Sequence, residues 1–401
     1  MSATSTEAQP RIAIVGGGPS GLVLLLTLIK RGVPATLYER ELDSNSRAHL
    51  GGMLDLEWDS GQRAFRENGM EHVFKKYSRR DAEEGRICGK DGVPVFRHDN
   101  TEADPDDLRN ARPEIDRHVL RDILLDAVPK DAVQWGHALA STRPLEGGQH
   151  ELTFTNGTVT VTDIVVGADG ANSRIRPLLS PAVPLYHGIT GAEISLTPAV
   201  AALPENHAIS NGVGKGSCYL AQDGQVVVLQ RNGTGRIRGY FWQRNPLEWT
   251  LPRDAKAAKA VLGGMFADWA PWVRRFIEQG DEDAIYVRPL FHLIVGHRWE
   301  HTPGVTLIGD AAHLMSPFAG AGANLAMRDG LELGLVLADA VAKGVLLKER
   351  EDAVAAWEEN MFVRVERFAA LTVQNMGLFF GPDAPQAAIK AFEDAQAADP
   401  A

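Results

Sequence analysis

The chain has 401 residues, of which 44% are hydrophobic and 23% charged, and this composition indicates a globular protein large enough for two joined domains. Its formal net charge of −11 argues against a nucleic acid or an anionic membrane surface as a partner, because both attract clustered positive charge. The two cysteines, Cys88 and Cys218, are far apart in the sequence, which argues against a disulfide scaffold or a structural zinc site.

The N-terminal residues 1–10 are polar, so we predict a flexible segment that is neither a signal peptide nor an anchor. The longest apolar stretch, 22–29, is too short to cross a bilayer. We therefore expect a cytoplasmic monomer with no membrane partner and no bound metal.

The first motif is a glycine-rich turn, 16–21, directly behind the apolar run 12–15. This order predicts a buried strand, a tight turn and a helix. Gly16 would permit the sharp turn, Gly18 would let the backbone approach a pyrophosphate, and Gly21 would let the helix pack closely on the sheet. The turn therefore predicts a dinucleotide site.

The helix that follows, from about Ser20 to Lys30, would point its positive N-terminal end at the phosphates. Glu39 closes the next apolar run, eighteen residues after Gly21, where its carboxylate would accept hydrogen bonds from the adenosine ribose. Arg40 would add a charge near the adenine. Because strand, turn, helix and acidic residue occur in register, the dinucleotide interpretation is favoured over a simple turn.

A second motif follows the apolar strand that ends near 167. Its Asp169-Gly170 turn could hold a loop against the cofactor phosphates and ribose, although such a turn after a strand is often only a turn. Asp55 lies between two leucines, where an unpaired carboxylate would be costly, so we expect it to have a partner.

The region 183–288 is predicted to be an insert made of antiparallel strands, such as 225–230 and 236–242. Segment 255–278 predicts amphipathic helices broken at Pro271. Segment 352–380 predicts a helix packed across both domains. Alternatively, its end, with Phe379, lines a substrate entrance.

The third motif begins with the strand 306–308 and Gly309-Asp310, and leads into a helix near 325. Asp310 would bind a ribityl hydroxyl. Small residues at 319–323 would let a flat ring lie against backbone N–H groups, and the helix N-terminus would stabilise negative charge on that ring. The predicted ring contacts are Gly320, Gly322, Ala323 and Asn324.

Three histidines near this motif allow other interpretations. His313 is predicted to be a packing and hydrogen-bonding residue beneath the loop rather than a catalytic base. His297 and His301 have the spacing of a helical metal pair but no third ligand, so we predict exposed turn histidines.

Together these motifs resemble those of the single-component flavoprotein monooxygenases, which include aromatic-ring hydroxylases such as para-hydroxybenzoate hydroxylase. Within that group, the chain is most similar to the tetracycline-inactivating monooxygenases and their polyketide-tailoring relatives. The stretches that carry the likeness are 51–56, 112–117, 309–324 and the tail around 361–362. In order along the chain, they span nearly its whole length.

The resemblance implies an α/β fold with a discontinuous Rossmann-like FAD-binding domain, an inserted antiparallel-sheet substrate domain and a C-terminal bridging helix. The FAD-binding domain would comprise 11–75, 101–182 and 289–345. The substrate domain would comprise 76–100 and 183–288, followed by the C-terminal helical segment 346–401. The resemblance further implies that FAD is held by Glu39, Arg40, Asp55, Arg117 and Asp310, and that Arg47 matches a position linked to NADPH. From the sequence alone, Arg117 could also be a surface ion pair.

The implied activity is insertion of one oxygen atom from O₂ into an aromatic or polyketide-like small molecule through a flavin hydroperoxide, in antibiotic inactivation or secondary-metabolite tailoring. The chemistry is carried by the flavin, so no side chain is assigned as catalytic. The predicted substrate wall consists of Tyr219, Arg238, Tyr240, Trp242, Pro317, Phe318 and Phe379. Positions in the insert that would line the substrate cavity, such as Ala192, Ser217 and Arg238, do not reproduce the polar side chains associated with tetracycline recognition, which argues against that substrate. The alternatives are a flavoprotein oxidase or dehydrogenase, or a catalytically silent FAD-binding relative.

Overall fold

The first motif lies at the centre of a parallel sheet in the computed structural model, which describes residues 9–47, 51–98 and 108–398. Residues 1–8 of the predicted flexible N-terminus, and residues 101–107 of the predicted FAD-binding domain, lie outside the described residues. The sheet has the strand order β17-β11-β1-β2-β7, and its described pairs are parallel. Its strands are β1 (Ile12–Val15), β2 (Ala35–Tyr38), β7 (Val133–Gln134), β11 (Ile164–Gly167) and β17 (Val305–Leu307).

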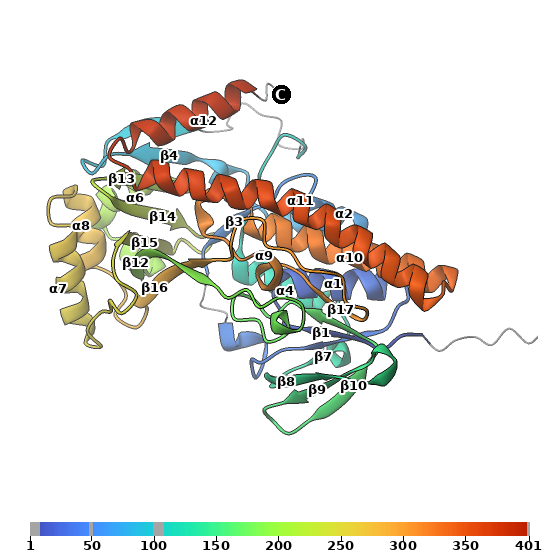
Figure 1. Ribbon diagram of the computed structural model, residues 1–401. Coiled ribbons are helices and arrows are strands. Elements are labelled where there is room, and N and C mark those ends of the chain that lie inside the picture. The colour runs from blue at the N-terminus through green and yellow to red at the C-terminus, as the bar shows by residue number, and fades with distance from the viewer. Residues whose placement is uncertain (1–8, 48–50, 99–107, 399–401) are drawn as a thin grey trace, which may run out of the picture.

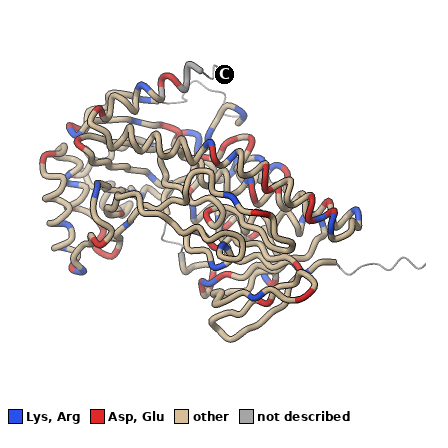
Figure 2. Tube along the Cα trace, viewed as in Figure 1, with Lys and Arg blue, Asp and Glu red and all other residues tan. Residues whose placement is uncertain are grey.

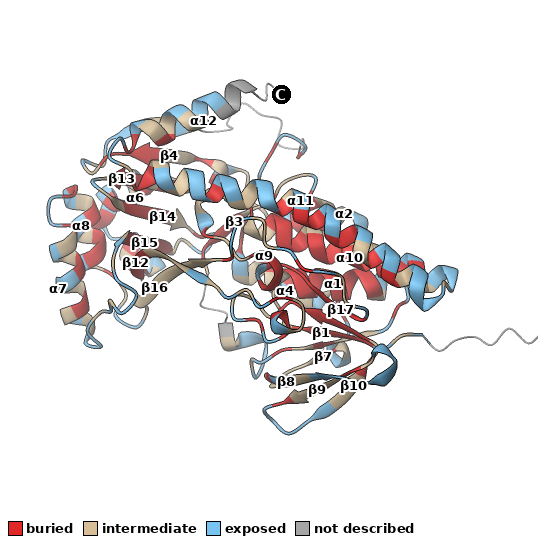
Figure 3. Ribbon diagram, viewed as in Figure 1, coloured by how far each residue is buried: buried red, intermediate tan, exposed pale blue. Residues whose placement is uncertain are grey.

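Helices and a small sheet cover this parallel sheet on its two sides (Figure 1). On one side, α1 (Pro19–Lys30) packs against α10 (Gly322–Lys343), and α4 (Arg117–Asp126) packs beside α1. On the other lie the antiparallel strands β8 (Leu139–Pro144), β9 (His150–Phe154) and β10 (Val159–Thr162). The stacked rings of Tyr38 and Phe154 join β2 to β9. The largest core therefore lies around the predicted dinucleotide fold, and Figure 3 shows α1 and α10 as its most buried helices.

The second sheet has seven strands in the order β16-β12-β15-β14-β13-β4-β5. They are β4 (Gly85–Cys88), β5 (Pro94–His98), β12 (Leu185–Leu196), β13 (Ser217–Gln222), β14 (Gln225–Arg231), β15 (Ile237–Arg244) and β16 (Tyr286–His292). The pairs are antiparallel except for the pair of β13 with β4, which is parallel. Strand β4 comes from an earlier segment of the chain.

One face of this sheet is covered by helices α6 (His207–Val213), α7 (Ala255–Met265) and α8 (Pro271–Glu278). Pro271 is the first residue of α8, where the N–H group that proline lacks would have no partner within the helix. The predicted break at this residue is therefore present. Branched aliphatic side chains and aromatic rings, including Phe241 and Phe276, fill the core beneath. We call the opposite face of the sheet the site face; it carries Tyr219, Tyr240 and Trp242.

Helix α11 (Leu347–Phe379) runs along both parts of the molecule (Figure 1). Its first half buries Trp357 and Met361 in the core of the parallel sheet, and its end buries Phe379 against the site face. Helix α12 (Gln386–Ala398) follows it. The α/β fold with an inserted antiparallel sheet and a bridging C-terminal helix, predicted above, is thereby confirmed.

Several shorter elements complete the fold. The strands β3 (Met53–Asp55) and β6 (Glu114–Asp116) form a separate antiparallel pair. The remaining helices are α2 (Gly61–Glu67), α3 (Glu71–Tyr77), α5 (Pro198–Ala201) and α9 (Asp310–His313). The 3-10 turns are η1 (Ser44–Arg47), η2 (Asp81–Glu83), η3 (Lys130–Ala132), η4 (Glu146–Gly148), η5 (Arg176–Leu178), η6 (Pro204–Asn206) and η7 (Pro317–Ala319).

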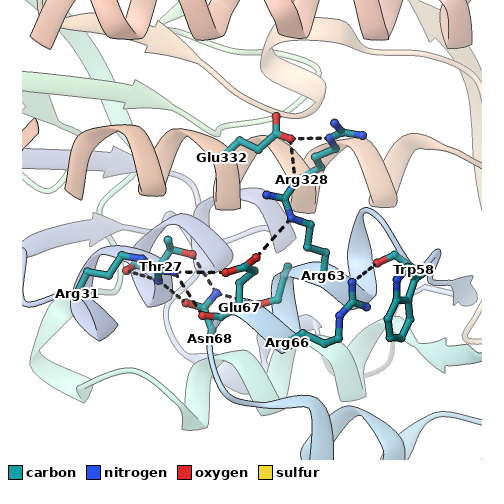
Figure 4. Close-up of polar contacts among 10 residues, drawn as sticks. Thr27, Arg31, Trp58, Arg63, Arg66, Glu67, Asn68, Arg328 and Glu332 are labelled. Carbon is teal, nitrogen blue, oxygen red and sulfur yellow. Dashed lines mark hydrogen bonds and ion pairs between the residues drawn. The ribbon is translucent and has the colours of Figure 1, made fainter. Parts of the chain in front are cut away.

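Polar contacts hold α2 in place between α1 and α10 (Figure 4). Arg63 and Arg328 both contact the same oxygen of Glu332, at 3.3 and 2.7 Å. The side-chain amide of Asn68 donates to Thr27 Oγ1 on α1 at 3.0 Å. These contacts fix the segment that follows β3.

Along α11, positions with basic residues are interspersed with positions that carry acidic ones (Figure 2). Among the described residues, no helix combines the length and the apolar character that crossing a membrane requires. Over the same part of the chain, no three His, Cys, Asp or Glu residues gather as a metal site would need.

Candidate active site

The three glycines of the first turn have different surroundings. Gly16 has a φ of +113°, and a Cβ added there would lie 2.2 Å from the carbonyl oxygen of Ala168. A Cβ at Gly21 would lie 2.1 Å from the oxygen of Gly16. By contrast, a Cβ at Gly18 would meet no protein atom within 4 Å. Packing within the protein therefore requires Gly16 and Gly21, whereas Gly18 faces open space at the N-terminus of α1.

Glu39 is buried, and its carboxylate holds this turn. Its Oε2 accepts from the backbone N–H of Gly17 at 2.6 Å, and its Oε1 accepts from that of Glu41 at 3.0 Å. Arg40 is exposed and lies 3.5 Å from a carboxylate oxygen of Glu41. Each Glu39 oxygen keeps a lone pair with which it can accept a further hydrogen bond.

Two other predicted cofactor residues lie in different settings. Ser20 is buried where α1 crosses α10, since a Cβ added at Gly330 would lie 2.3 Å from its carbonyl oxygen. Its backbone thus forms part of a tight helix contact. Arg47 ends the turn η1, and its side chain lies outside the described residues.

The second motif is fixed by Asp169 and Arg176. Asp169 Oδ2 accepts from the backbone N–H of Arg174 at 2.7 Å, while its buried Oδ1 has no hydrogen-bond partner among the described residues. The buried Arg176 guanidinium donates to the carbonyl oxygens of Ala311 and Asp310, at 2.7 and 3.2 Å. Arg176 thus joins the second motif to the third, a role that the sequence did not reveal because its acceptors are backbone atoms far along the chain.

The third motif presents backbone rather than side chains. Asp310 has an exposed carboxylate at the start of α9. Gly320 adopts a φ of +63°, and a Cβ at Gly322 would meet no protein atom within 4 Å. Ala323 is half-buried in the first turn of α10. This short stretch has room for a flat group against its backbone.

The side chain of Asn324 is fully engaged within the protein. Its Oδ1 accepts from the N–H groups of Glu57 and Gly61, at 2.9 and 3.2 Å, and from Ser60 Oγ at 3.0 Å. Its amide donates to the carbonyl oxygen of Asp55 at 2.8 Å. Asn324 therefore anchors the segment after β3, and its side-chain oxygen is already used within the protein.

Asp55 has the partner that its apolar sequence setting predicted. Arg112 Nη2 lies 2.5 Å from Asp55 Oδ2 and 2.9 Å from Glu57 Oε1. Burial raises the pKa of Asp55, and the Arg112 charge opposes that rise. Arg117 is exposed, its side chain packs over Gly51, and its N–H donates to the oxygen of Gly52 at 3.1 Å.

Aromatic residues from three separate segments meet on the site face. Tyr240 stacks on Trp242 with ring centroids 5.2 Å apart, and Trp242 meets Phe318 edge-on at 5.8 Å. Phe379 lies 6.0 Å from Phe318 and 6.2 Å from Tyr219. Burial raises the pKa of Tyr240 to about 12. Pro317, predicted with this group, is exposed and begins η7 beside Phe318.

Other residues of the predicted substrate wall lie in different settings. Arg238 is buried in an ion pair with Glu193, whose second oxygen is 2.7 Å from Arg288 Nε. Ala192 packs in the core under α7 and α8, on the opposite side of the sheet. The prediction that Ala192 lines the substrate cavity was therefore wrong. Ser217 remains on the site face, in register with Gln230.

The three histidines all bond within the protein. His313 Nε2 lies 2.6 Å from Asp329 Oδ2, which supports the predicted packing and hydrogen-bonding role. The prediction of exposed turn histidines at 297 and 301 was wrong. His297 is half-buried between Ala312 and Ser180, and His301 is half-buried with Nδ1 2.8 Å from Glu358.

These features fit a dinucleotide cofactor with a flat ring system. Space opens at Gly18 in front of a helix N-terminus, and the unpartnered Asp169 Oδ1 can accept a hydrogen bond. The backbone around Gly322 is uncovered, and the aromatic group of the site face includes Phe318, five residues before Ala323. The helix N-terminus at Gly18 suits phosphates, Asp169 suits a ribose, and the backbone around Gly322 suits a flat ring.

Comparison with known proteins agrees with this fit. Residues 292–353 match the family described as FAD binding domain. A relative, Monooxygenase asqM of Emericella nidulans, is 28% identical over 94% of this chain and 97% of its own length. Another, 3-amino-4-hydroxybenzoate 2-monooxygenase PtmB3 of Streptomyces platensis, is 29% identical over 94% of this chain and 90% of its own.

A solved structure, that of tetracycline destructase Tet(51), shares the fold with a TM-score of 0.69 at 18% identity, over 98% of this chain and 96% of that chain. The predicted resemblance to flavoprotein monooxygenases is confirmed by these matches. The chain is an FAD-dependent monooxygenase.

Proposed function

We propose that the protein uses NADPH and dioxygen to insert one oxygen atom into an aromatic or polyketide-like small molecule. The observation that carries this proposal is the aromatic group of Tyr240, Trp242 and Phe318, which brings the inserted sheet and the third motif together. A planar molecule held there would lie beside the uncovered backbone near Gly322.

The cofactor would be held mainly by backbone groups. The N-terminus of α1, left open at Gly18, would bind the phosphates, and Glu39 would accept hydrogen bonds from the ribose. The exposed Asp310 carboxylate would bind the ribityl chain, and the N–H groups from 320 to 324 would contact the ring. When bound, FAD supplies the redox chemistry, taking reducing equivalents from the nicotinamide and activating dioxygen.

The substrate would be recognised largely through shape and stacking. Trp242 and Phe379 are buried, and Tyr240 and Phe318 are half-buried, so these rings would exclude water from a planar substrate. PtmB3 carries an aminohydroxybenzoate in its name, which supports an aromatic substrate here. We extend the proposal to a role in secondary-metabolite tailoring or in antibiotic inactivation, and for the second role the support is the fold shared with Tet(51).

Two tryptophan substitutions, one on the site face and one outside the sheet against the core under α7 and α8, test the substrate wall. Trp242→Leu should raise KM for an accepted phenol by about tenfold, because a stacking surface is lost. The matched control is Trp249→Leu, since Trp249 packs against the core under α7 and α8. We expect that variant to keep the wild-type KM.

The measurement is NADPH oxidation with a panel of phenols and polyketides, together with product identification. Stimulated oxidation that yields an oxygenated product supports the proposal. An equal KM for the Trp242 and Trp249 variants would place the substrate elsewhere. Stimulated oxidation that gives only hydrogen peroxide would favour the oxidase alternative, and tight FAD with no reduction would favour the silent relative.

A further inference from the structure

The buried carboxylate of Asp329 contacts both ends of the turn that carries Asp310. Asp329 lies within α10 and is fully buried. Its Oδ2 accepts from the backbone N–H of Gly309 at 3.1 Å and lies 2.6 Å from Nε2 of His313. Gly309 directly precedes α9, and His313 is the last residue of that helix. One carboxylate oxygen therefore spans the whole of α9.

The turn depends on such contacts because its backbone bends sharply and its helix is short. Gly309 has a φ of +60°, and a Cβ there would lie 2.9 Å from Ser20 Oγ. Its carbonyl oxygen accepts from the N–H groups of Ala312 and His313, at 2.8 and 3.0 Å. A helix of four residues has little stability of its own, because the entropy lost in its first turn outweighs its few hydrogen bonds. Contacts with other elements must therefore keep it in place.

Two buried side chains of opposite charge provide those contacts. The Arg176 guanidinium donates to the carbonyl oxygens of Asp310 and Ala311, at 3.2 and 2.7 Å. Asp329 accepts from the two ends of the same helix. The carboxylate of Asp310 itself is exposed. These contacts therefore fix the backbone that carries Asp310 and leave its side chain open to a ligand.

The other oxygen of Asp329 is bound by α11. Arg364 Nη2 lies 3.2 Å from Asp329 Oδ1, and Arg364 Nη1 lies 3.1 Å from Glu332 Oε2. A buried carboxylate is costly unless it is paired and hydrogen-bonded, and Arg364 supplies a cation for this one. Because Arg364 contacts Oδ1 while the turn contacts Oδ2, substitutions can separate the charge pair from the hold on the turn.

We propose that Asp329 is a positioning residue for FAD, because it holds the Asp310 turn in the conformation that binds the ribityl chain. This inference rests on the contact between Asp310 and the ribityl chain that forms part of the proposed function. The ADP half of FAD would bind elsewhere, at the N-terminus of α1 and at Glu39. Loss of Asp329 should therefore weaken binding of the flavin half and spare binding of the ADP half.

Titration of the full-length apoprotein with FAD and, separately, with ADP tests this division. Asp329→Ala removes both contacts with the turn. We expect it to raise the FAD dissociation constant about tenfold or more, because a buried N–H and an imidazole lose their acceptor and the turn is released. The dissociation constant of ADP should change less than about twofold. FAD fluorescence and, for ADP, isothermal titration calorimetry measure the two constants.

The matched control is Glu358→Ala on α11. Glu358 is also a buried carboxylate within a long helix. Three side-chain donors contact it at 2.6 to 3.0 Å, and none of them belongs to α9: Trp299, His301 and Thr306. This variant should lose stability but keep the FAD dissociation constant within about twofold of wild type. If both carboxylate variants weaken FAD equally, the effect follows from lost stability alone and the inference is overturned.

A second variant covers the case in which Asp329→Ala does not fold. Combining it with Arg364→Met removes both partners of the buried ion pair, which costs less stability than removing one. The double variant should show the same weakened FAD binding and retained ADP binding. Arg364→Met alone keeps both contacts with the turn and should bind FAD within about twofold of wild type. A double variant that also fails to fold would assign Asp329 to folding rather than to the cofactor and overturn the inference.

The outcomes separate the inference from the proposed function. Unchanged FAD affinity in Asp329→Ala, or an equal loss of FAD and ADP affinity, would overturn the positioning role. Asp310→Ala tests the underlying contact and should weaken binding of FAD, but not of ADP, about tenfold. If it binds FAD like the wild type, the ribityl contact fails and the inference fails with it. A weakened Asp310 variant beside an unaffected Asp329 variant overturns the inference alone.

Discussion

At the scale of single residues, a substitution at Gly18 is expected to weaken cofactor binding without weakening the fold. A Cβ at Gly18 meets no protein atom within 4 Å, whereas one at Gly16 would lie 2.2 Å from a carbonyl oxygen. Gly18→Val should therefore leave the unfolding free energy of the apoprotein within about 1 kcal/mol of wild type, yet weaken FAD binding at least tenfold by blocking the pyrophosphate (~1.4 kcal/mol).

The comparison variant for that experiment is Gly16→Ala, which should lower the unfolding free energy by about 2 kcal/mol or more because the new side chain collides with backbone at a positive φ. Urea unfolding of the apoproteins and FAD fluorescence titration measure the two effects. Wild-type FAD affinity in the Gly18 variant would place the pyrophosphate elsewhere.

The sequence predicted such glycine positions well, because local spacing determines a strand, turn and helix. It could not predict what Ser20 and Asn324 contact. Ser20 packs where α1 crosses α10, and Asn324 bonds to residues more than 260 positions earlier in the chain. Side-chain partners of this kind depend on the tertiary fold, which local patterns do not encode.

At the scale of elements, Asn324 joins the start of α10 to the segment between β3 and α2. Asn324→Ala removes four hydrogen bonds and leaves buried N–H groups unsatisfied. We expect it to lower the unfolding free energy by about 2–4 kcal/mol.

The control is Asn360→Ala on α11. Asn360 is exposed and bonds only within its own helix, so its loss should change stability by less than about 0.5 kcal/mol. Urea unfolding at neutral pH measures both variants. Equal stability of the two would contradict the anchoring role of Asn324.

The alternation of side chains between the two faces of a strand explains one correct prediction and one wrong prediction. Tyr240 and Trp242 are two residues apart, so the sequence placed them on one face, as the structure has them. Ala192 was assigned to the same face and lies on the other, because it pairs with Phe241 rather than with Tyr240 or Trp242. A shift of one residue in register reverses every side chain, and register is set by pairing between distant strands.

At the scale of the whole molecule, Asp116 joins the β3–β6 pair to the seven-stranded sheet. This buried carboxylate at the end of β6 accepts from the Asn232 amide at 3.0 Å and from the Gly233 N–H at 2.9 Å, both in the β14–β15 turn. Asp116→Ala should lower the unfolding free energy by about 2–4 kcal/mol and loosen the contact between the domains.

Differential scanning calorimetry tests this link. We expect the Asp116 variant to melt at a lower temperature and with a broader transition than wild type, since the β3–β6 pair would be less coupled to the seven-stranded sheet. The exposed Asp126 on α4 provides the control, and Asp126→Ala should melt like the wild type. An unchanged transition for Asp116→Ala would show that other contacts join the domains.

The overall architecture was predictable because three motifs along the chain each carry a local signal for the same cofactor. The parallel pairing of β13 with β4 was not, since β4 lies about 130 residues earlier than its partner. By contrast, the helix that the sequence predicted to pack across both domains is present as the 33-residue α11, which is buried in two different cores along its length.

The most direct measurement is the visible spectrum of the purified protein, first after anaerobic addition of NADPH and then after admission of isotopically labelled dioxygen with a panel of phenols and polyketides. We expect flavin bands that bleach with NADPH, recover with oxygen and leave a product containing one labelled oxygen atom. A colourless protein that cannot be reconstituted with FAD, or a reduced flavin that yields only hydrogen peroxide with every candidate, would contradict it.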